Sequence, residues 1–177
     1  VFPFQFGNDR PPRPAWIELD LARWRRNYRL IQQALPAGLR LLAVVKDEAY
    51  GHGLLPAARV ATESGVSFLA VATVEEAVKL RDGGVRTPIL LLGERQESEL
   101  PWCLAHHLTC CVSEPHGIAK LAQLATRAGR RVPVHLKINT GMNRYGARWN
   151  EVATVAEKIR AEKSLSLEGA LSHFAQS

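Results

Sequence analysis

The sequence has no long apolar segment and no recognisable leader. Among its 177 residues, no apolar run approaches the roughly 18 residues that a membrane-spanning helix needs. The opening stretch, VFPFQFGNDRPPRP, has no basic region followed by an apolar one and no initiating methionine. We therefore expect no secretory signal peptide, no membrane partner and a cytoplasmic protein. Four prolines in this stretch predict an extended arm over residues 1–14.

Cysteine is scarce, and its spacing fits neither a disulfide set nor a metal site. The three cysteines, Cys103, Cys110 and Cys111, are odd in number and lack CxxC spacing. Two of them lie in LTCCV, an apolar run that is typical of a strand. We expect reduced, packed thiols and no bound metal.

Acidic residues are absent from residues 21–46, although the same stretch holds six basic residues. With a formal net charge of +6, one hypothesis is a nucleic-acid-binding module. The alternative is the solvated face of a helix, because Arg23, Arg26 and Arg29 recur with helical spacing. We favour the solvated face and expect no nucleic-acid partner.

Strand-like and helix-like patterns alternate at intervals of roughly 20 to 35 residues, which predicts an α/β protein with a parallel sheet. The intervals favour a (β/α)₈ TIM-type barrel, with a doubly wound open sheet as the alternative. A barrel needs eight strands, so six would leave two free edges and an open core. We expect residues 15–177 to form the N-terminal portion of such a barrel, either as a fragment of a longer protein or with a partner that covers the gap. The expected barrel strands span residues 39–45, 67–71, 88–92, 108–112, 132–138 and 167–173.

Helices are expected between these strands. The clearest begins at Thr73, where Glu76 completes a capping-box sequence, and ends at two glycines. WIELDL, residues 16–21, predicts an additional early strand, after which Asp20 is suited to cap a helix. The other expected helices span residues 54–64, 97–107, 114–129 and 150–163.

The stretch LLAVVKDEAYGHG ends an apolar strand in Lys46. Active sites of (β/α)₈ barrels lie at the carboxyl ends of the strands. An amine that is partly desolvated at the mouth of a barrel becomes a nucleophile, as a Schiff-base lysine requires. Tyr50 offers a hydroxyl, while Gly51 and Gly53 let the backbone approach a ligand, so a phosphate could bind there. For Lys46 taken alone, a solvated surface lysine is the alternative.

Two later stretches place further polar residues after strands. In HLKINTGMNRYG, Gly141 allows a tight turn between Lys137 and Arg144, and the planar Arg144 fork suits a carboxylate or a phenolate. In GALSHF, His173 lies at the end of the last expected strand. The alternatives are an ordinary loop arginine and a structural histidine.

These stretches together resemble the alanine racemase family. AVVKDEAYGHG is similar to its cofactor-lysine motif, and the family's second and third motifs resemble LKINTGMNRYG and LSHFAQS. AWIELDLARWRRNYRLI resembles its opening segment. The resemblance runs from about Pro14 to the last residue. It implies a pyridoxal 5′-phosphate barrel followed by a mostly β domain, acting as a homodimer that interconverts L- and D-alanine for peptidoglycan.

The resemblance also implies a role for each site residue. Lys46 would be the Schiff-base lysine and one of two catalytic bases. Tyr50 would bind the cofactor phosphate, and His173 would lie beside the cofactor ring. Arg144 would contact the phenolic oxygen of the cofactor and the carboxylate of the substrate. Lys137 matches a lysine that is carbamylated in some members.

The chain departs from the family pattern at three positions. Asp47 and Glu48 stand where the family has a small residue followed by Asp or Asn, and Asn139 stands where Asp is common. A carboxylate at Asp47 would favour the charged form of Lys46 and oppose its activation. The family's second base, a tyrosine of the partner's C-terminal domain, is not in this sequence. We expect residues 1–177 alone not to racemise alanine; the alternative function is a non-catalytic pyridoxal-phosphate-binding barrel.

Overall fold

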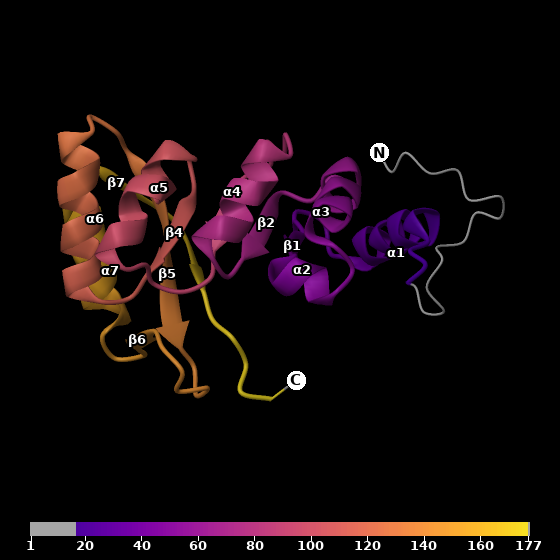
Figure 1. The fold of residues 1–177 in the computed structure, drawn as a ribbon. Helices are drawn as coiled ribbons and strands as arrows, with labels where there is room; N and C mark the ends of the chain where they lie inside the picture. Colours follow the sequence, from indigo (N-terminus) through magenta and orange to yellow (C-terminus); the bar gives the residue numbers. More distant parts are fainter. Residues whose placement is uncertain (1–16, 177) are drawn as a thin grey trace.

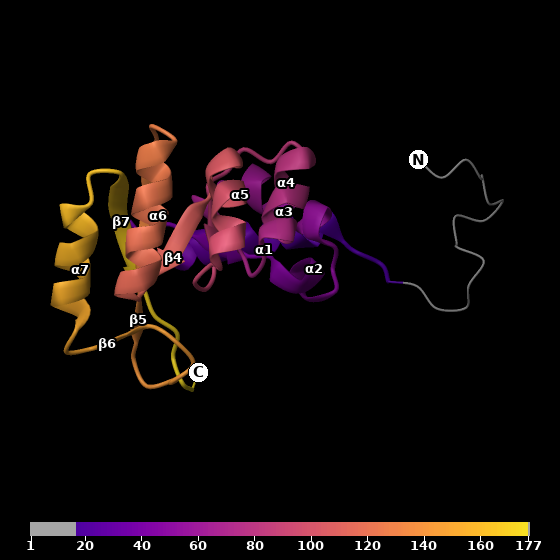
Figure 2. The ribbon, with the colours of Figure 1, turned by 60° about the vertical axis from the view of Figure 1, so that its left-hand side comes forward.

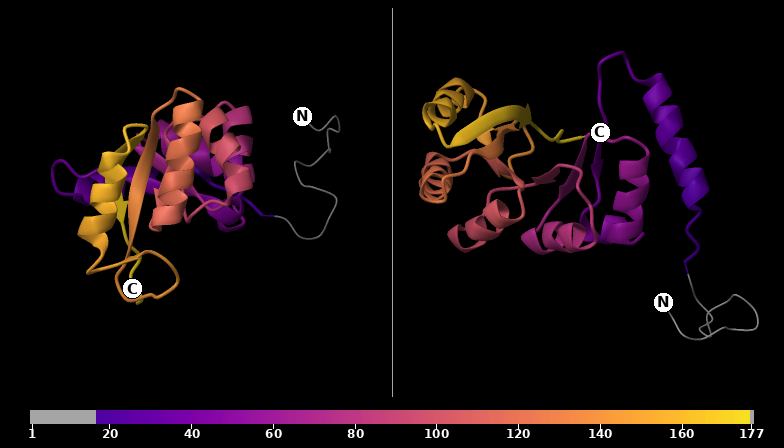
Figure 3. Two further views of the ribbon diagram at one scale, coloured as in Figure 1. Left: turned by 90° about the vertical axis from the view of Figure 1, so that its left-hand side faces the viewer. Right: turned by 90° about the horizontal axis from the view of Figure 1, so that it is seen from above.

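Six parallel strands form one curved sheet in the computed structural model, which describes residues 17–176. The helices lie along the outer side of the curve, and the inner side is open (Figures 1 and 3). This arrangement confirms the predicted α/β fold, an incomplete (β/α)₈ barrel. The strands, in the order of their pairing, are β1 (Leu42–Val44), β2 (Phe68–Val71), β3 (Ile89–Leu91), β4 (Thr109–Val112), β5 (Val132–Asn139) and β7 (Leu165–Leu171).

One further strand was not predicted. The two residues of β6 (Ala147–Arg148) pair in parallel with the carboxyl end of β5, where Ile138 lies opposite Ala147. This pairing folds the loop after β5 back against its own strand. Figure 1 shows this loop at the lower edge of the sheet, where the arrow of β5 ends.

The connecting helices agree with the predicted series (Figure 2). The capping box at the start of α4 is formed as predicted: Thr73 Oγ1 accepts from Glu76 N at 3.2 Å, and Glu76 Oε2 accepts from Thr73 N at 3.1 Å. The helices are α1 (Leu21–Ala34), α3 (Leu54–Glu63), α4 (Val74–Asp82), α5 (Leu100–Ala105), α6 (Pro115–Arg127) and α7 (Val152–Ala161), with a 3₁₀ turn, η1 (Glu97–Glu99), before α5.

The predicted early strand is wrong for the part of it that the structure describes. Residues 17–20 pair with no strand, and Ile17 is 75% exposed, because apolar alternation alone supplies no neighbouring edge. Asp20 does cap α1, since its carboxylate accepts from Arg23 N at 2.8 Å. The predicted arm, residues 1–14, lies outside the described residues.

Helix α1 is attached to α3 by polar contacts. The guanidinium of Arg25 lies 2.6 Å from the Glu63 carboxylate, and the Gln32 amide donates to the Ser64 carbonyl at 2.7 Å. No residue of α1 is fully buried, and its three helically spaced arginines are exposed, as a solvated face requires. None of the helices within residues 17–176 is long and apolar enough to cross a membrane.

The core lies between the sheet and the outer helices. Leu69, Ile89 and Leu91 of the sheet and Leu121 of α6 are fully buried, and the three cysteines are free and buried, as predicted. The edge strand β1 is different: its Leu42 and Val44 are 40% and 38% exposed. Free edges at β1 and β7, with apolar side chains uncovered, are what an incomplete barrel predicts.

Candidate functional site

Lys46 lies two residues after β1 and begins the short segment α2 (Lys46–Tyr50), whose backbone is left-handed from Asp47 onwards. The φ angles of Asp47, Glu48 and Ala49 are 54°, 53° and 52°, and that of Tyr50 is 57°. Each left-handed residue other than glycine costs roughly 1–2 kcal/mol. Four in succession therefore require support from neighbouring groups, and strain of this kind is typical of functional sites. The sequence indicated positive φ at Gly51 and Gly53 only.

The strained turn presents two of the predicted site residues. The Lys46 ammonium lies 3.2 Å from the Asp47 carboxylate, and the Lys46 side chain is 33% exposed. The predicted carboxylate beside the lysine is therefore present as an ion pair. Tyr50, at the other end of the turn, is 62% exposed. Both residues stand at the carboxyl end of β1, the end at which barrel enzymes bind their ligands.

Lys137, Arg144 and His173 line one small pocket at the carboxyl ends of β5 and β7. Lys137 comes from β5 itself, Arg144 from the following loop, and His173 lies two residues beyond β7. The Thr140 hydroxyl donates to the His173 carbonyl at 3.4 Å and so joins the loop to the C-terminal segment. Lys137 and Arg144, which lie close together in the sequence, thus share a pocket with His173 from the end of the chain.

Lys137 is a buried amine, only 4% exposed. Burial lowers the pKa of Lys137; Cys111 opposes this shift, and the Arg144 cation adds to it. No acidic side chain within residues 17–176 lies close enough to form an ion pair with it. The lowered pKa makes the neutral amine more accessible than it is in a solvated lysine.

Tyr145 lies beside both cations of the pocket. Its ring centre is 5.4 Å from Lys137 Nζ and 5.5 Å from Arg144 Cζ, distances at which a cation is attracted to an aromatic ring. Burial raises the pKa of the Tyr145 hydroxyl, and Cys111 raises it further. Tyr145 directly follows Arg144 in the sequence and contacts both cations of the pocket.

Asn139 organises the loop that carries Arg144. Its Oδ1 accepts from the backbone N–H groups of Gly141 and Asn143, each at 3.1 Å, and its Nδ2 donates to Asn143 Oδ1 at 2.9 Å. An aspartate could make the first two contacts but could not donate the third. Asn139 is therefore suited to a loop that has Asn143 opposite it.

Lys46 and Tyr50 do not reach this pocket. They follow β1, whereas the pocket lies between β5 and β7 at the other edge of the sheet. All six strands are parallel, so both groups face the same end of the barrel. The predicted residues thus form two half-sites at one end of the incomplete barrel. The first half-site is Lys46 and Tyr50 after β1, and the second is the pocket of Lys137, Arg144 and His173.

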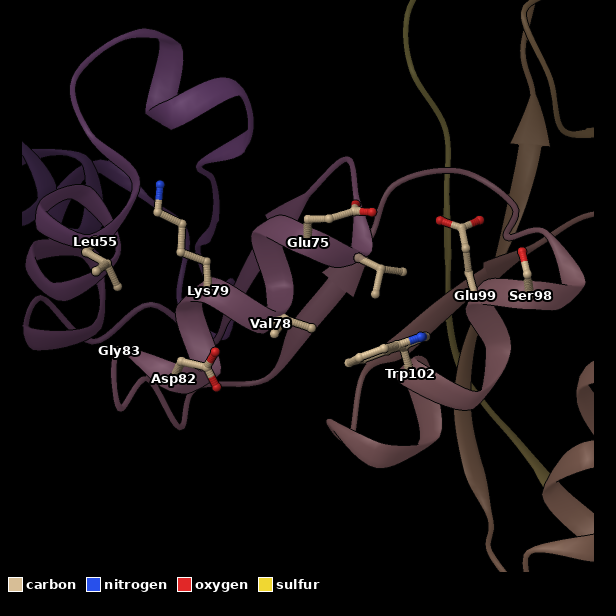
Figure 4. A pocket seen from close by; sticks show the side chains of 10 residues that line it. Leu55, Glu75, Val78, Lys79, Asp82, Gly83, Ser98, Glu99 and Trp102 are labelled. Atoms are coloured by element: carbon tan, nitrogen blue, oxygen red, sulfur yellow. The ribbon is translucent and has the colours of Figure 1, made fainter.

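A larger hollow lies elsewhere, on the outer surface. A groove of about 820 Å³ runs between α4 and α5, with Val78 and Trp102 on its walls (Figure 4). None of the predicted site residues lines it, so it does not correspond to the predicted chemistry. Residues 17–176 also contain no group of three or more His, Cys, Asp or Glu side chains arranged to hold a metal ion.

Comparison with known proteins agrees with the fold and the motifs. The family model described as "Alanine racemase, N-terminal domain" matches residues 19–177. The alanine racemase of Citrifermentans bemidjiense is 39% identical over 165 residues, covering 92% of this chain and 44% of that protein. That of Halothermothrix orenii is 35% identical over 168 residues, covering 95% and 44%.

A solved structure is similar as well. The Clostridium difficile 630 alanine racemase in complex with cycloserine superimposes with a TM-score of 0.86 at 30% identity, over 94% of this chain and 46% of that one. The chain therefore spans less than half the length of the curated relatives that it matches. Because the family model covers nearly all of the sequence, the chain belongs to the alanine racemase N-terminal domain family.

Proposed function

We propose that this chain is the N-terminal barrel portion of a pyridoxal-phosphate-dependent alanine racemase that interconverts L- and D-alanine. The observation that carries the proposal is Lys46, presented by a strained turn at the carboxyl end of β1, in a chain of this family. The whole protein would act in the cytoplasm as a homodimer and supply D-alanine for peptidoglycan.

The residues present fit the cofactor. Lys46 offers a primary amine, Tyr50 a phenolic hydroxyl, and the glycine-containing turn after it offers backbone N–H groups, a set suited to an aldehyde that carries a phosphate. Arg144, in the second half-site, offers a planar fork for an anionic oxygen. Pyridoxal 5′-phosphate would supply the aldehyde and a ring that delocalises the electron pair left by the departing α-proton.

The chain's own residues would then have separable tasks. Lys46 would hold the cofactor and move a proton at its Nζ, for which it must leave Asp47. Tyr50 would bind the phosphate, and His173 would lie beside the ring. Arg144 would hold the substrate carboxylate and the phenolic oxygen, so that the reacting carbon faces the lysine.

Lys137 would serve the site by orienting Arg144. Its lowered pKa favours the neutral amine, which is the form that adds carbon dioxide and releases a proton to solvent to give an anionic carbamate. A carbamate at this position would place a negative charge beside the Arg144 guanidinium in the same pocket. We propose this modification as part of the same function.

The test is the site of covalent attachment. Residues 1–177 are incubated with pyridoxal 5′-phosphate; an absorbance band at about 420 nm is expected. Borohydride reduction followed by peptide mapping should then place the label on Lys46, and Lys46→Met should abolish both signals. A label on Lys79, Lys120 or Lys137 instead would overturn the assignment. A label on Lys46 in a longer protein that never racemises alanine would favour the non-catalytic barrel.

A further inference from the structure

The left-handed turn of residues 47–50 is stabilised only in part by its own backbone. Ala49 N donates to Val45 O at 2.9 Å, and Gly53 N donates to Glu48 O at 2.7 Å. Only Ala49 of the turn is buried, so packing holds little of it in place. The backbone N–H of Asp47 needs a partner from outside the turn.

That partner is Glu76 of α4, whose carboxylate serves two elements at once. Its Oε2 accepts from the backbone N–H groups of Ala72 and Thr73, at 2.8 and 3.1 Å, and so caps α4. Its Oε1 accepts from Asp47 N at 2.5 Å. One oxygen therefore fixes the carboxylate to the start of α4, and the other fixes the turn to that carboxylate.

A second link runs one helical turn further along α4. Lys79 donates to the Glu48 carboxylate, whose other oxygen accepts from Leu54 N at 2.9 Å, at the start of α3. The Lys79 and Glu48 side chains are 54% and 53% exposed, so solvent screens their attraction. In Figure 4 the Lys79 side chain extends away from the groove that it lines. The less exposed Glu76 is the stronger of the two supports.

We infer that Glu76 is a positioning residue for the reaction: it holds the strained turn, and through the turn it sets where Lys46 and Tyr50 point. The inference rests on the proposed function for the roles of Lys46 and Tyr50. The position of Glu76 itself rests on the hydrogen bonds alone. The capping box is visible in the sequence, but the bond to Asp47 is not.

The experiment compares Glu76→Ala with Thr73→Ala in the full chain. Both variants break the capping box of α4, and only the first removes the acceptor of Asp47 N. Hydrogen exchange is read for residues 47–53, together with the rate at which pyridoxal 5′-phosphate labels Lys46 relative to Lys120. Glu76→Ala should speed exchange of residues 47–53 about tenfold more than Thr73→Ala, as loss of a hydrogen bond to a charged acceptor implies. Its Lys46-to-Lys120 labelling ratio should fall several-fold.

A rescue variant separates positioning from general loss of stability. Ala49→Gly removes the steric penalty of one left-handed residue, so the double variant Glu76→Ala/Ala49→Gly should regain most of the protection and the labelling ratio. Ala49→Gly alone serves as the control. Equal effects of Glu76→Ala and Thr73→Ala, or no recovery in the double variant, would overturn the inference. Absence of any Lys46 label in the unmodified chain would overturn the proposed function instead, and the exchange data would still decide the role of Glu76.

Discussion

Replacement of Gly146 by alanine should damage the loop that carries Arg144 more than any similar change at a neighbouring glycine. Gly146 has φ +123°, and a methyl group there would lie 2.8 Å from Asn139 N and 3.0 Å from the carbonyl carbon of Ile138. Both atoms belong to the backbone of β5, which is held by pairing with β4, β6 and β7. The obstacle cannot move aside as a flexible side chain would.

The magnitude follows from two additive costs. A non-glycine residue at such a φ costs about 1–3 kcal/mol, and overpacking against a fixed neighbour costs about 1–3 kcal/mol more. Gly146→Ala should therefore lower the unfolding free energy by about 4 kcal/mol. Gly141 provides the matched control, because its φ is +116° and a methyl group there would meet nothing within 4 Å. Gly141→Ala should lower the unfolding free energy by the backbone cost alone, about 2 kcal/mol.

The assay is urea unfolding, followed by circular dichroism and by tryptophan fluorescence. The slope of the free energy with urea should stay constant while the midpoint moves, since the fold itself is retained. Equal losses for Gly146→Ala and Gly141→Ala would show that the close approach to β5 carries no cost. That result would refute the reasoning from the contact distances.

Three further predictions concern buried or half-buried polar groups. Lys137→Met should raise the unfolding free energy at pH 7 by about 1 kcal/mol, because a buried charged amine is lost. Because burial lowers the pKa of Lys137, the unfolded chain binds more protons than the folded chain at pH values between the folded-state pKa and 10.5. The destabilisation caused by Lys137 therefore fades as the pH rises towards 10.5, and the stability gained by Lys137→Met should shrink with it. A gain in unfolding free energy that stays constant with pH would contradict this. Arg81→Met should lower the urea midpoint by the equivalent of about 2 kcal/mol, because three backbone carbonyls at 2.9–3.0 Å lose their donor; an unchanged midpoint would count against it. The thiols of Cys103, Cys110 and Cys111 should react with a thiol reagent only on unfolding, and fast labelling of the native chain would contradict their burial.

Much of the fold was predictable because its signals are local. Strand and helix patterns alternate along the chain, and Thr73 and Glu76 lie three residues apart, so one helical turn brings them together whatever surrounds them. The place of Lys46 at a strand end follows from the same local pattern. Where local pattern was the only guide, it also misled: residues 17–20 alternate like a strand, but no edge pairs with them.

The sequence by itself determined the order of the six barrel strands and their connecting helices, and the identity of the residues available for chemistry. Tertiary structure alone decided their geometry, because that depends on contacts between residues far apart in the chain. The second oxygen of Glu76 holds Asp47 in a left-handed turn, and the Tyr145 ring lies beside both Lys137 and Arg144. The open curve of the sheet also separates Lys46 from the Arg144 pocket, since β1 and β7 are its two free edges and no strand pattern specifies how far apart two edges lie.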